Sequence, residues 1–235
     1  MAGGKGGVGK STIALNLAIA NAQAGARTLL VDSDLGLAGL NLLLGVAPMR
    51  TILDALGGVP IDEVLLRTHE IELLPALNGS YLLSTLGAAT QQRILDLIAS
   101  LRDRFDRVVI DIAAGIGRAQ TAFAGATKAT IIVVGPEPSS VAGAYACLKV
   151  LASEQQLRHA YIVPNAVESA GQAHDLVGQL GALVARFLDI ELTAMPRIPI
   201  DPTVGEAARQ GVPLLVHAPR APAALAIRQL LSALA

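Results

Sequence analysis

The sequence predicts an α/β fold in which a doubly wound, mostly parallel sheet carries helices on both faces. Short β-branched runs alternate with longer helical patterns along the 235 residues, which is typical of right-handed βαβ crossovers. Hydrophobic residues make up 52% of the chain and charged residues 16%, as expected when most strands are covered on both faces. We expect one domain over residues 1–235.

The predicted strands are short apolar runs rich in valine, isoleucine and leucine. In chain order they cover residues 28–31, 70–74, Arg107–Asp111, 130–134, 160–163 and 192–198. Among the predicted helices, residues 90–105 carry apolar side chains at intervals of three and four, which form one stripe with charged residues left for solvent. The predicted helices cover residues 10–24, 90–105, 139–153, 170–188, 203–210 and Pro222–Leu234. Gly25 is expected to end the first of them.

The start of the chain departs from the usual order of this fold. A glycine-rich phosphate-binding loop normally follows a buried strand, yet only Met1, Ala2 and Gly3 precede the glycine-rich run here. We therefore expect the first strand of the sheet to be truncated, or its place to be taken by another segment.

Composition argues against several classes of site. The chain has 18 Lys and Arg against 19 Asp and Glu, so its overall charge does not indicate a nucleic-acid partner. Its single cysteine, Cys147, can form neither an intrachain disulfide nor a cysteine-only metal site. The four histidines lack the spacing of metal ligands, and no apolar run approaches the roughly 20 residues of a membrane span. We expect a cytoplasmic protein.

Residues 4–12 match the phosphate-binding loop pattern and carry the most specific signal in the sequence. In order they are Gly4, Lys5, Gly6, Gly7, Val8, Gly9, Lys10, Ser11 and Thr12. Backbone N–H groups of such a loop bind phosphate oxygens, so every position except Lys5 is a candidate contact to ATP. Lys10 is expected to contact the β- and γ-phosphates, and the Ser11 hydroxyl is expected to ligate Mg²⁺. The pattern predicts a P-loop NTPase.

Lys5 is unusual because a lysine this early in the loop has no evident role toward the nucleotide bound by its own chain. An ordinary solvated lysine is the alternative. The second lysine resembles the signature lysine of the deviant Walker A group, the MinD/ParA family of ATPases. That resemblance implies that Lys5 reaches across a dimer interface to the partner's phosphates. A cation supplied in this way is worth roughly 10³–10⁵ in rate.

Two aspartates follow the predicted strand 28–31, at a strand end where doubly wound sheets bind ligands. Asp34 matches the switch I aspartate of the family, and the resemblance implies that it positions the attacking water. Asp32 would support metal ligation nearby. Acidic caps on the following turn are the alternative.

The predicted strand Arg107–Asp111 ends in a third acidic residue. A hydrophobic strand that runs into an aspartate is typical of a Walker B motif, so Asp111 is a candidate Mg²⁺ ligand acting through water. Gly115, in the following loop, is expected to place a backbone N–H near the γ-phosphate. A capping aspartate is again the alternative.

Two later segments resemble the base-binding parts of the family. Asn165 follows the predicted strand 160–163, where relatives recognise adenine through an amide. The stretch containing Pro199 and Asp201 resembles the family's I-P-x-D segment, which lines the base and ribose. For this second stretch an ordinary proline-containing loop is the alternative.

Within the family, the chain is most similar to the MinD-like flagellar number regulators called FlhG or FleN. Three segments carry the similarity, residues 34–45, 71–76 and 135–151. In the last segment Glu137 and Ser139 are candidate contacts near the nucleotide and the dimer face. Gly39 and Asn41 depart from the family, which usually has asparagine and aspartate at these positions. The resemblance implies regulation of flagellar number or placement, with a regulatory protein partner.

MinD-type proteins also end in a basic amphipathic helix that binds the membrane when the protein dimerises. Here the last residues, 222–235, carry Arg228 as their one charge and contain no aromatic residue. We expect this segment to be a closing helix of the core, which leaves weak support for binding at the inner membrane face.

The function that these features predict is an ATPase that forms a homodimer around ATP, with ATP and Mg²⁺ as cofactors. Switch segments at residues 34–39 and 111–117 are expected to relax when the γ-phosphate leaves. One alternative is an ATP-dependent synthetase of the cobyrinic-acid a,c-diamide or dethiobiotin type, which shares the loop and the fold. Another is a ParA-like DNA partition ATPase, which would need a basic surface. An iron–sulfur electron carrier would need at least two cysteines per protomer.

Overall fold

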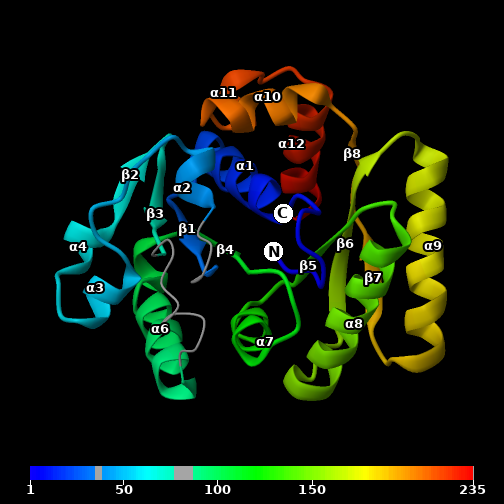
Figure 1. The fold of residues 1–235 in the computed structure, drawn as a ribbon, viewed down its shortest axis with the longest axis horizontal. Coiled ribbons are helices and arrows are strands. Elements are labelled where there is room, and N and C mark those ends of the chain that lie inside the picture. The colour runs from blue at the N-terminus through cyan, green and yellow to red at the C-terminus, as the bar shows by residue number, and fades with distance from the viewer. Residues whose placement is uncertain (35–38, 77–86, 235) are drawn as a thin grey trace. The chain divides into compact units, whose positions relative to one another are not determined.

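The computed structural model describes residues 1–34, 39–76 and 87–234, which form two compact units (Figure 1). Unit 1 consists of Met1–Lys10, Ile112–Pro202 and Arg220–Ala235. Unit 2 consists of Ser11–Asp111 and Thr203–Pro219. Each unit contains its own β-sheet with helices packed on it.

The sheet of unit 2 has the strand order β2-β3-β1-β4 (Figure 1). Its strands are β1 (Thr28–Asp32), β2 (Leu66–Thr68), β3 (Ile71–Leu74) and β4 (Arg107–Asp111). The central strand β1 runs parallel to β3 and to β4, and all of its residues are buried. β2 pairs antiparallel with β3 through a tight turn at His69 and Glu70, which both have positive φ angles.

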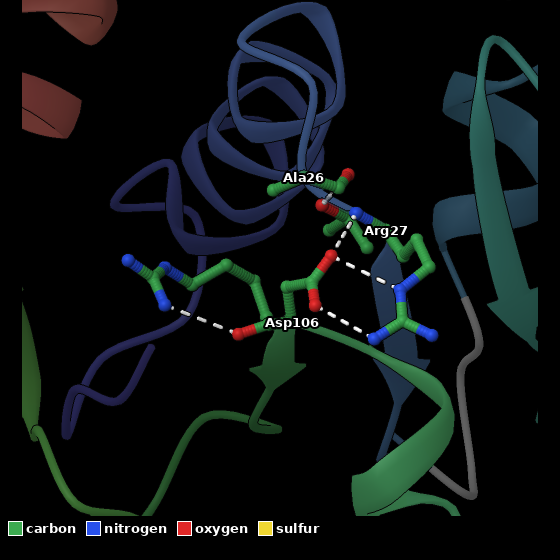
Figure 2. Close-up of polar contacts among 5 residues, drawn as sticks. Ala26, Arg27 and Asp106 are labelled. Atoms are coloured by element: carbon green, nitrogen blue, oxygen red, sulfur yellow. Dashed lines mark hydrogen bonds and ion pairs between the residues drawn. The ribbon is translucent and has the colours of Figure 1, made fainter.

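An ion pair links the N-terminal ends of β1 and β4 (Figure 2). The Arg27 guanidinium donates to both carboxylate oxygens of Asp106, with Nη2 to Oδ1 at 2.7 Å and Nε to Oδ2 at 3.1 Å. The backbone N–H of Arg27 also donates to Asp106 Oδ2, at 2.9 Å. These bonds hold the pKa of Asp106 at about 2, because they favour the ionised carboxylate. The two strands are thereby aligned at the ends opposite Asp32 and Asp111.

Unit 2 contains both long and short helices. They are α1 (Lys10–Gln23), α2 (Leu40–Leu43), α3 (Ile52–Leu56), α4 (Ile61–Val64), α6 (Ala88–Ser100), α10 (Pro202–Gln210) and α11 (Leu214–His217). α1 is buried along most of its length and includes a buried polar residue, Asn16. Asn16 is tolerated there because its side chain is hydrogen-bonded. The Asn16 Nδ2 group donates to the Thr12 carbonyl, and its Oδ1 accepts from the N–H of Leu215. This side chain ties α1 to α11.

The sheet of unit 1 is parallel, with the order β5-β6-β7 and a short strand β8 beside the end of β6. The strands are β5 (Ile131–Val134), β6 (His159–Val167), β7 (Glu191–Ala194) and β8 (Ile198–Pro199). The helices are α7 (Arg118–Gly125), α8 (Pro138–Gln155), α9 (Ala170–Phe187) and α12 (Pro222–Leu234). α8 packs on β5 and α9 packs on β6.

The last helix, α12, closes the core of unit 1. It packs on β8, and its buried residues are Ala223, Ala224, Ala226, Ile227 and Leu230. This agrees with the closing role expected from its low charge. Among the helices that the structure describes, none combines the length and the apolar character needed to cross a membrane.

The first residues of the chain pair as a short strand would. The N–H of Ala2 donates to the Ile131 carbonyl at 2.8 Å, and the N–H of Val133 donates to the Ala2 carbonyl at 3.2 Å, in a parallel bridge beside β5. The carbonyl of Met1 accepts from the N–H of Ile112. These few residues lead directly into the glycine-rich loop. They therefore occupy the position in the chain at which a buried first strand was expected.

The predicted α/β class and the parallel pairing are confirmed, and most predicted elements end within about two residues of the observed ones. The prediction of one strand over residues 192–198 is wrong. Ladder pairing with β6 stops after Met195, because Pro196 has no N–H to donate, and it resumes as β8 with Ile198 opposite Asn165.

The prediction of one helix over residues 90–105 is partly wrong, and several short elements were not predicted. α6 starts earlier, at Ala88, and ends at Ser100, before a 3-10 turn at Arg102–Arg104. Elements β2, α2, α3, α4, α7 and α11 have no counterpart in the prediction. Most of these are only three to five residues long, too short for apolar periodicity to identify.

Candidate functional site

The glycine-rich loop of unit 1 runs from the short N-terminal pairing segment into α1. Gly6 and Gly7 are exposed, while Val8 and Lys10 are buried. α1 begins at Lys10, so the loop leads straight into a helix N-terminus, where unpaired N–H groups favour an anion. The Lys10 ammonium donates to the carbonyl of Lys5 at 3.1 Å. A buried ammonium beside exposed glycines suits the phosphate group of a nucleotide.

Asn165 contacts the loop directly, although it is more than 150 residues away in sequence. Its Nδ2 group donates to the carbonyl of Val8 at 2.8 Å. Gly9 follows with φ +94°, a conformation that L side chains rarely adopt, and a Cβ there would lie 2.3 Å from Asn165 Nδ2. Asn165 therefore fixes the C-terminal part of the loop, and its expected contact with adenine stays a prediction.

Lys5 lies at the other end of the loop, against α8. Its Nζ is 3.9 Å from Oε2 of Glu137, the N-cap residue of α8, and the two side chains are 38% and 58% exposed. An ion pair this exposed contributes little to stability. The Lys5 ammonium therefore stays accessible to a second anion, unlike the buried Lys10.

The I-P-x-D stretch lies beside Asn165 in the sheet. Ile198 and Pro199 pair with Asn165 and Val167 of β6. The carboxylate of Asp201 accepts from the N–H of Ala223, at the start of α12, at 3.0 Å. Asp201 thus has a structural role as a helix cap, and its expected contact with ribose is a prediction that this geometry does not address.

Unit 2 holds Asp32, Asp34 and Asp111, the acidic residues at the predicted strand ends. Asp32 and Asp111 end the neighbouring parallel strands β1 and β4 as register partners, and their side chains are 2% and 3% exposed. Burial, and then the charge of Asp111, raises the pKa of Asp32 to about 7. The Asp32 carboxylate accepts from the backbone N–H groups of Asp34, at 3.0 Å, and Leu40, at 3.4 Å. Asp34 itself is half-buried.

Two buried carboxylates at adjacent strand ends repel each other, and a divalent cation between them would be attracted to both. Burial and then repulsion by Asp111 raise the pKa of Asp32, and a cation would relieve the repulsion. Mg²⁺ usually takes one or two carboxylates and keeps several waters. Among the described residues no group of three or more acidic, histidine or cysteine side chains could form a fuller cage. The two carboxylates therefore suit Mg²⁺ completed by water, with Ser11 of the same unit, in the first turn of α1, as a further candidate ligand.

The segment after Asp111 contains Gly115, whose expected contact with the γ-phosphate stays a prediction. Gly115, with φ +121°, donates its N–H to the carbonyl of Gly3 at 3.3 Å. A contact to a γ-phosphate would have to replace this bond. The other expected switch segment, residues 34–39, includes residues 35–38, which lie outside the described part of the chain.

The structure also shows a residue that sequence reasoning missed. Gly143, in the middle of α8, contacts the backbone of Gly4 and Lys5 closely. A glycine inside a predicted helix was the available signal, because such a glycine costs stability unless close packing requires it. Cys147, on the same helix, is buried, and burial raises its pKa to about 11, which is typical of a structural thiol.

Comparison with known proteins identifies the family. A ParA family model described as the NUBPL iron-transfer P-loop NTPase matches residues 1–235. The chain belongs to the ParA family of P-loop NTPases. The MinD/ParA membership expected from Lys5 and the loop is thereby confirmed, and the ATP-binding P-loop character with it.

Three relatives in this family illustrate the range of similarity. The antiactivator FleN of Pseudomonas aeruginosa is 34% identical over 228 residues, which cover 96% of this chain and 81% of FleN. The septum site-determining protein MinD of Synechocystis is 30% identical over 223 residues, covering 91% and 80%. The structure of MinD from Pyrococcus horikoshii, complexed with Mg-ADP, has a TM-score of 0.81 over 99% of this chain and 93% of that one, at 23% identity. The MinD-like fold is therefore established for this ParA family member.

Proposed function

We propose that this ParA family protein is an ATP-dependent dimerising switch with weak ATPase activity. The observation that carries the proposal is the different environment of its two loop lysines. Lys10 is buried, whereas the Lys5 side chain is 38% exposed, and its ion-pair partner among the described residues is the exposed Glu137, a weak surface contact. Lys10 suits the chain's own phosphates, and Lys5 suits those of a second protomer.

In this proposal the loop residues Gly4, Gly6, Gly7, Val8, Gly9, Ser11 and Thr12 hold the phosphates of ATP, with Lys10 on the β- and γ-phosphates. Asn165, Pro199 and Asp201 contact the base and ribose. Ser11, Asp32 and Asp111 hold Mg²⁺, which when bound would neutralise charge between the phosphate oxygens. Asp34 positions the attacking water, and Lys5 stabilises charge on the partner's phosphates.

Dimer assembly follows from differential affinity. ATP drives closure only to the extent that it binds the dimer better than the monomers, and the Lys5 contact to the partner's phosphates supplies that difference. After hydrolysis the γ-phosphate contact of Lys5 is lost, and the Gly115 N–H is free to return to the Gly3 carbonyl. The dimer then opens.

The biological role that we propose is MinD-like positioning in the cytoplasm, most closely the control of flagellar number or placement. The support is the resemblance of residues 34–45, 71–76 and 135–151 to the flagellar number regulators, together with the similarity to the antiactivator FleN over 96% of this chain. A regulatory protein partner belongs to this proposal. The buried apolar face of α12 gives no support to membrane binding through that helix, and the near-neutral charge gives none to nucleic acid.

The test is the molar mass by light scattering with Mg·ADP and with Mg²⁺ and a non-hydrolysable ATP analogue. We expect a monomer with ADP and a dimer with the analogue. Lys5→Ala should bind both nucleotides yet stay monomeric, while the control Lys149→Ala, which removes an exposed lysine of α8, should behave as wild type. A monomer in every state would contradict the switch and favour an ATP-dependent synthetase.

A further inference from the structure

The glycine-rich loop is supported at two separate places in unit 1. Asn165 holds the part around Val8 and Gly9, through the Nδ2 bond to the Val8 carbonyl. Helix α8 holds the part around Gly4 and Lys5, through Gly143. Between the two supports, a Cβ on Gly7 would meet no atom within 4 Å. The beginning and the end of the loop are therefore fixed by different elements.

The contact at Gly143 is a contact between backbones. A Cβ placed on Gly4 would lie 2.1 Å from the carbonyl oxygen of Gly143, a separation that real Cβ atoms do not show. A Cβ placed on Gly143 would lie 3.2 Å from the carbonyl carbon of Gly4 and 3.3 Å from the nitrogen of Lys5. Because the obstructing atoms are backbone, no side-chain rotation can relieve either overlap.

The same helix also contacts the side chain of Lys5. Glu137, the N-cap of α8, lies 3.9 Å from the Lys5 ammonium. α8 thus reaches Lys5 at two points, its backbone through Gly143 and its ammonium through Glu137. A Cβ placed on Gly6, Gly7 or Gly9 would not have an atom of α8 among its nearest neighbours within 4 Å in the described part of the chain.

We propose that Gly143 is a positioning residue for Lys5, and that its missing side chain lets α8 set the place of the Lys5 backbone. This inference rests on the proposed ATP-dependent dimer. A methyl group at position 143 would push the Lys5 backbone away by a few tenths of an ångström. Lys5 acts across an interface, where small displacements weaken a contact strongly. Nucleotide binding within the chain should change much less, because Gly4 is one of several loop residues proposed to contact the phosphates and the others lie away from Gly143.

The experiment compares Gly143→Ala and Gly143→Val with Gly178→Ala and Gly178→Val. Gly178 lies in the interior of α9, and a Cβ there meets no atom within 4 Å, so these controls reproduce the change in helix propensity without the contact. Three quantities are measured on the full chain: the affinity for ADP, the protein concentration at half-maximal dimerisation with the ATP analogue, and the amide resonances of Gly4 and Lys5.

The expected result is selective. Gly143→Ala should raise the half-maximal concentration for dimerisation by about tenfold, with the valine variant more severe, while the affinity for ADP changes by less than about threefold. The Gly178 variants should match wild type. Dimerisation at the wild-type concentration, or an equal loss of ADP affinity and dimerisation, would overturn the proposal.

The amide resonances separate this inference from the proposed function. If wild-type protein does not dimerise with the ATP analogue, the proposed function fails, and the resonances of the free chain decide on Gly143. Movement of the Gly4 and Lys5 amides in Gly143→Ala, and not in Gly178→Ala, would support the positioning role. Unmoved amides would overturn it.

Discussion

At the scale of single residues, the sharpest feature is a pair of buried acids at adjacent strand ends. Asp32 and Asp111 could be predicted from sequence as acidic strand ends, because a hydrophobic strand running into an aspartate is recognisable locally. Their pairing could not, because the register between β1 and β4 joins residues 79 positions apart. The raised pKa of Asp32 follows first from burial and then from that pairing.

Asp32→Asn should stabilise the metal-free protein at neutral pH by about 1–3 kcal/mol, because it removes one of two buried like charges without changing the shape of the side chain. The free energy of unfolding is measured in urea with EDTA. Mg²⁺ should stabilise wild type and have a smaller effect on the variant. A variant that is less stable than wild type with EDTA would show that the carboxylates do not repel each other.

The raised pKa of Asp32 determines in which direction the stability of the folded chain changes with pH. The folded pKa of Asp32, about 7, lies above the value of about 3.9 in the unfolded chain. The folded state therefore binds the proton more tightly, and this group's contribution to stability is lost as the pH rises from about 4 through 7. Without Mg²⁺, wild type should lose stability over this range relative to Asp32→Asn. Parallel curves for the two proteins would contradict the raised pKa.

Asp106 should behave in the opposite way. Its pKa of about 2 lies below the unfolded value of about 3.9, so its contribution is present above pH 4 and disappears as the pH falls through 2. Asp106→Asn should therefore lower the melting temperature slightly at pH 7 and leave it unchanged near pH 2. The control Asp103→Asn alters a side chain that is 94% exposed, and it should have no measurable effect at either pH.

At the scale of elements, the phosphate-binding loop shows how far local sequence reaches. The glycine pattern predicts a loop followed by a helix, and α1 starts at Lys10 as expected. The supports of the loop come from β6 and α8, elements more than 130 residues away. Their contacts depend on tertiary packing, which is why Asn165 was predicted only by family resemblance and Gly143 was missed.

Gly9→Ala should weaken ADP binding by at least about tenfold, because the new Cβ collides with Asn165 Nδ2 in a segment that approaches phosphate. Calorimetric titration measures the affinity. Gly25→Ala is the matched control, since Gly25 has a similar φ of +91° but open space around its Cβ position. Both variants should lose about 1 kcal/mol of stability from backbone strain. Equal ADP affinities in the two variants would mean that the contact with Asn165 is unimportant for binding.

At the scale of the whole molecule, the two units contribute different chemistry to the proposed switch. Unit 1 carries most of the loop, both lysines and Asn165, and unit 2 carries Ser11 and the three aspartates. The expectation of a single domain over residues 1–235 stays a prediction. The proposed cycle of dimer closure and opening is a property of the complete chain, so its tests use the complete chain.

Asp34→Ala should trap the ATP-bound dimer. The variant lacks the carboxylate proposed to position water, so hydrolysis should slow by roughly 10²-fold or more while assembly persists. Phosphate release and molar mass after mixing with Mg·ATP are the measurements. Asp175→Ala, which removes an exposed carboxylate of α9, should retain the wild-type rate. Rapid hydrolysis by Asp34→Ala would assign the water to another residue.

The sequence by itself determined the α/β class, the loop, the family and the acidic strand ends, because each depends on residues close together in the chain. Only the tertiary structure decided the break between β7 and β8, the pairing of Asp32 with Asp111, and the contacts of Asn165 and Gly143 with the loop. These features depend on strand register and on close backbone approach between distant segments. Periodicity and propensity carry no information about either, since both describe only local neighbours along the chain.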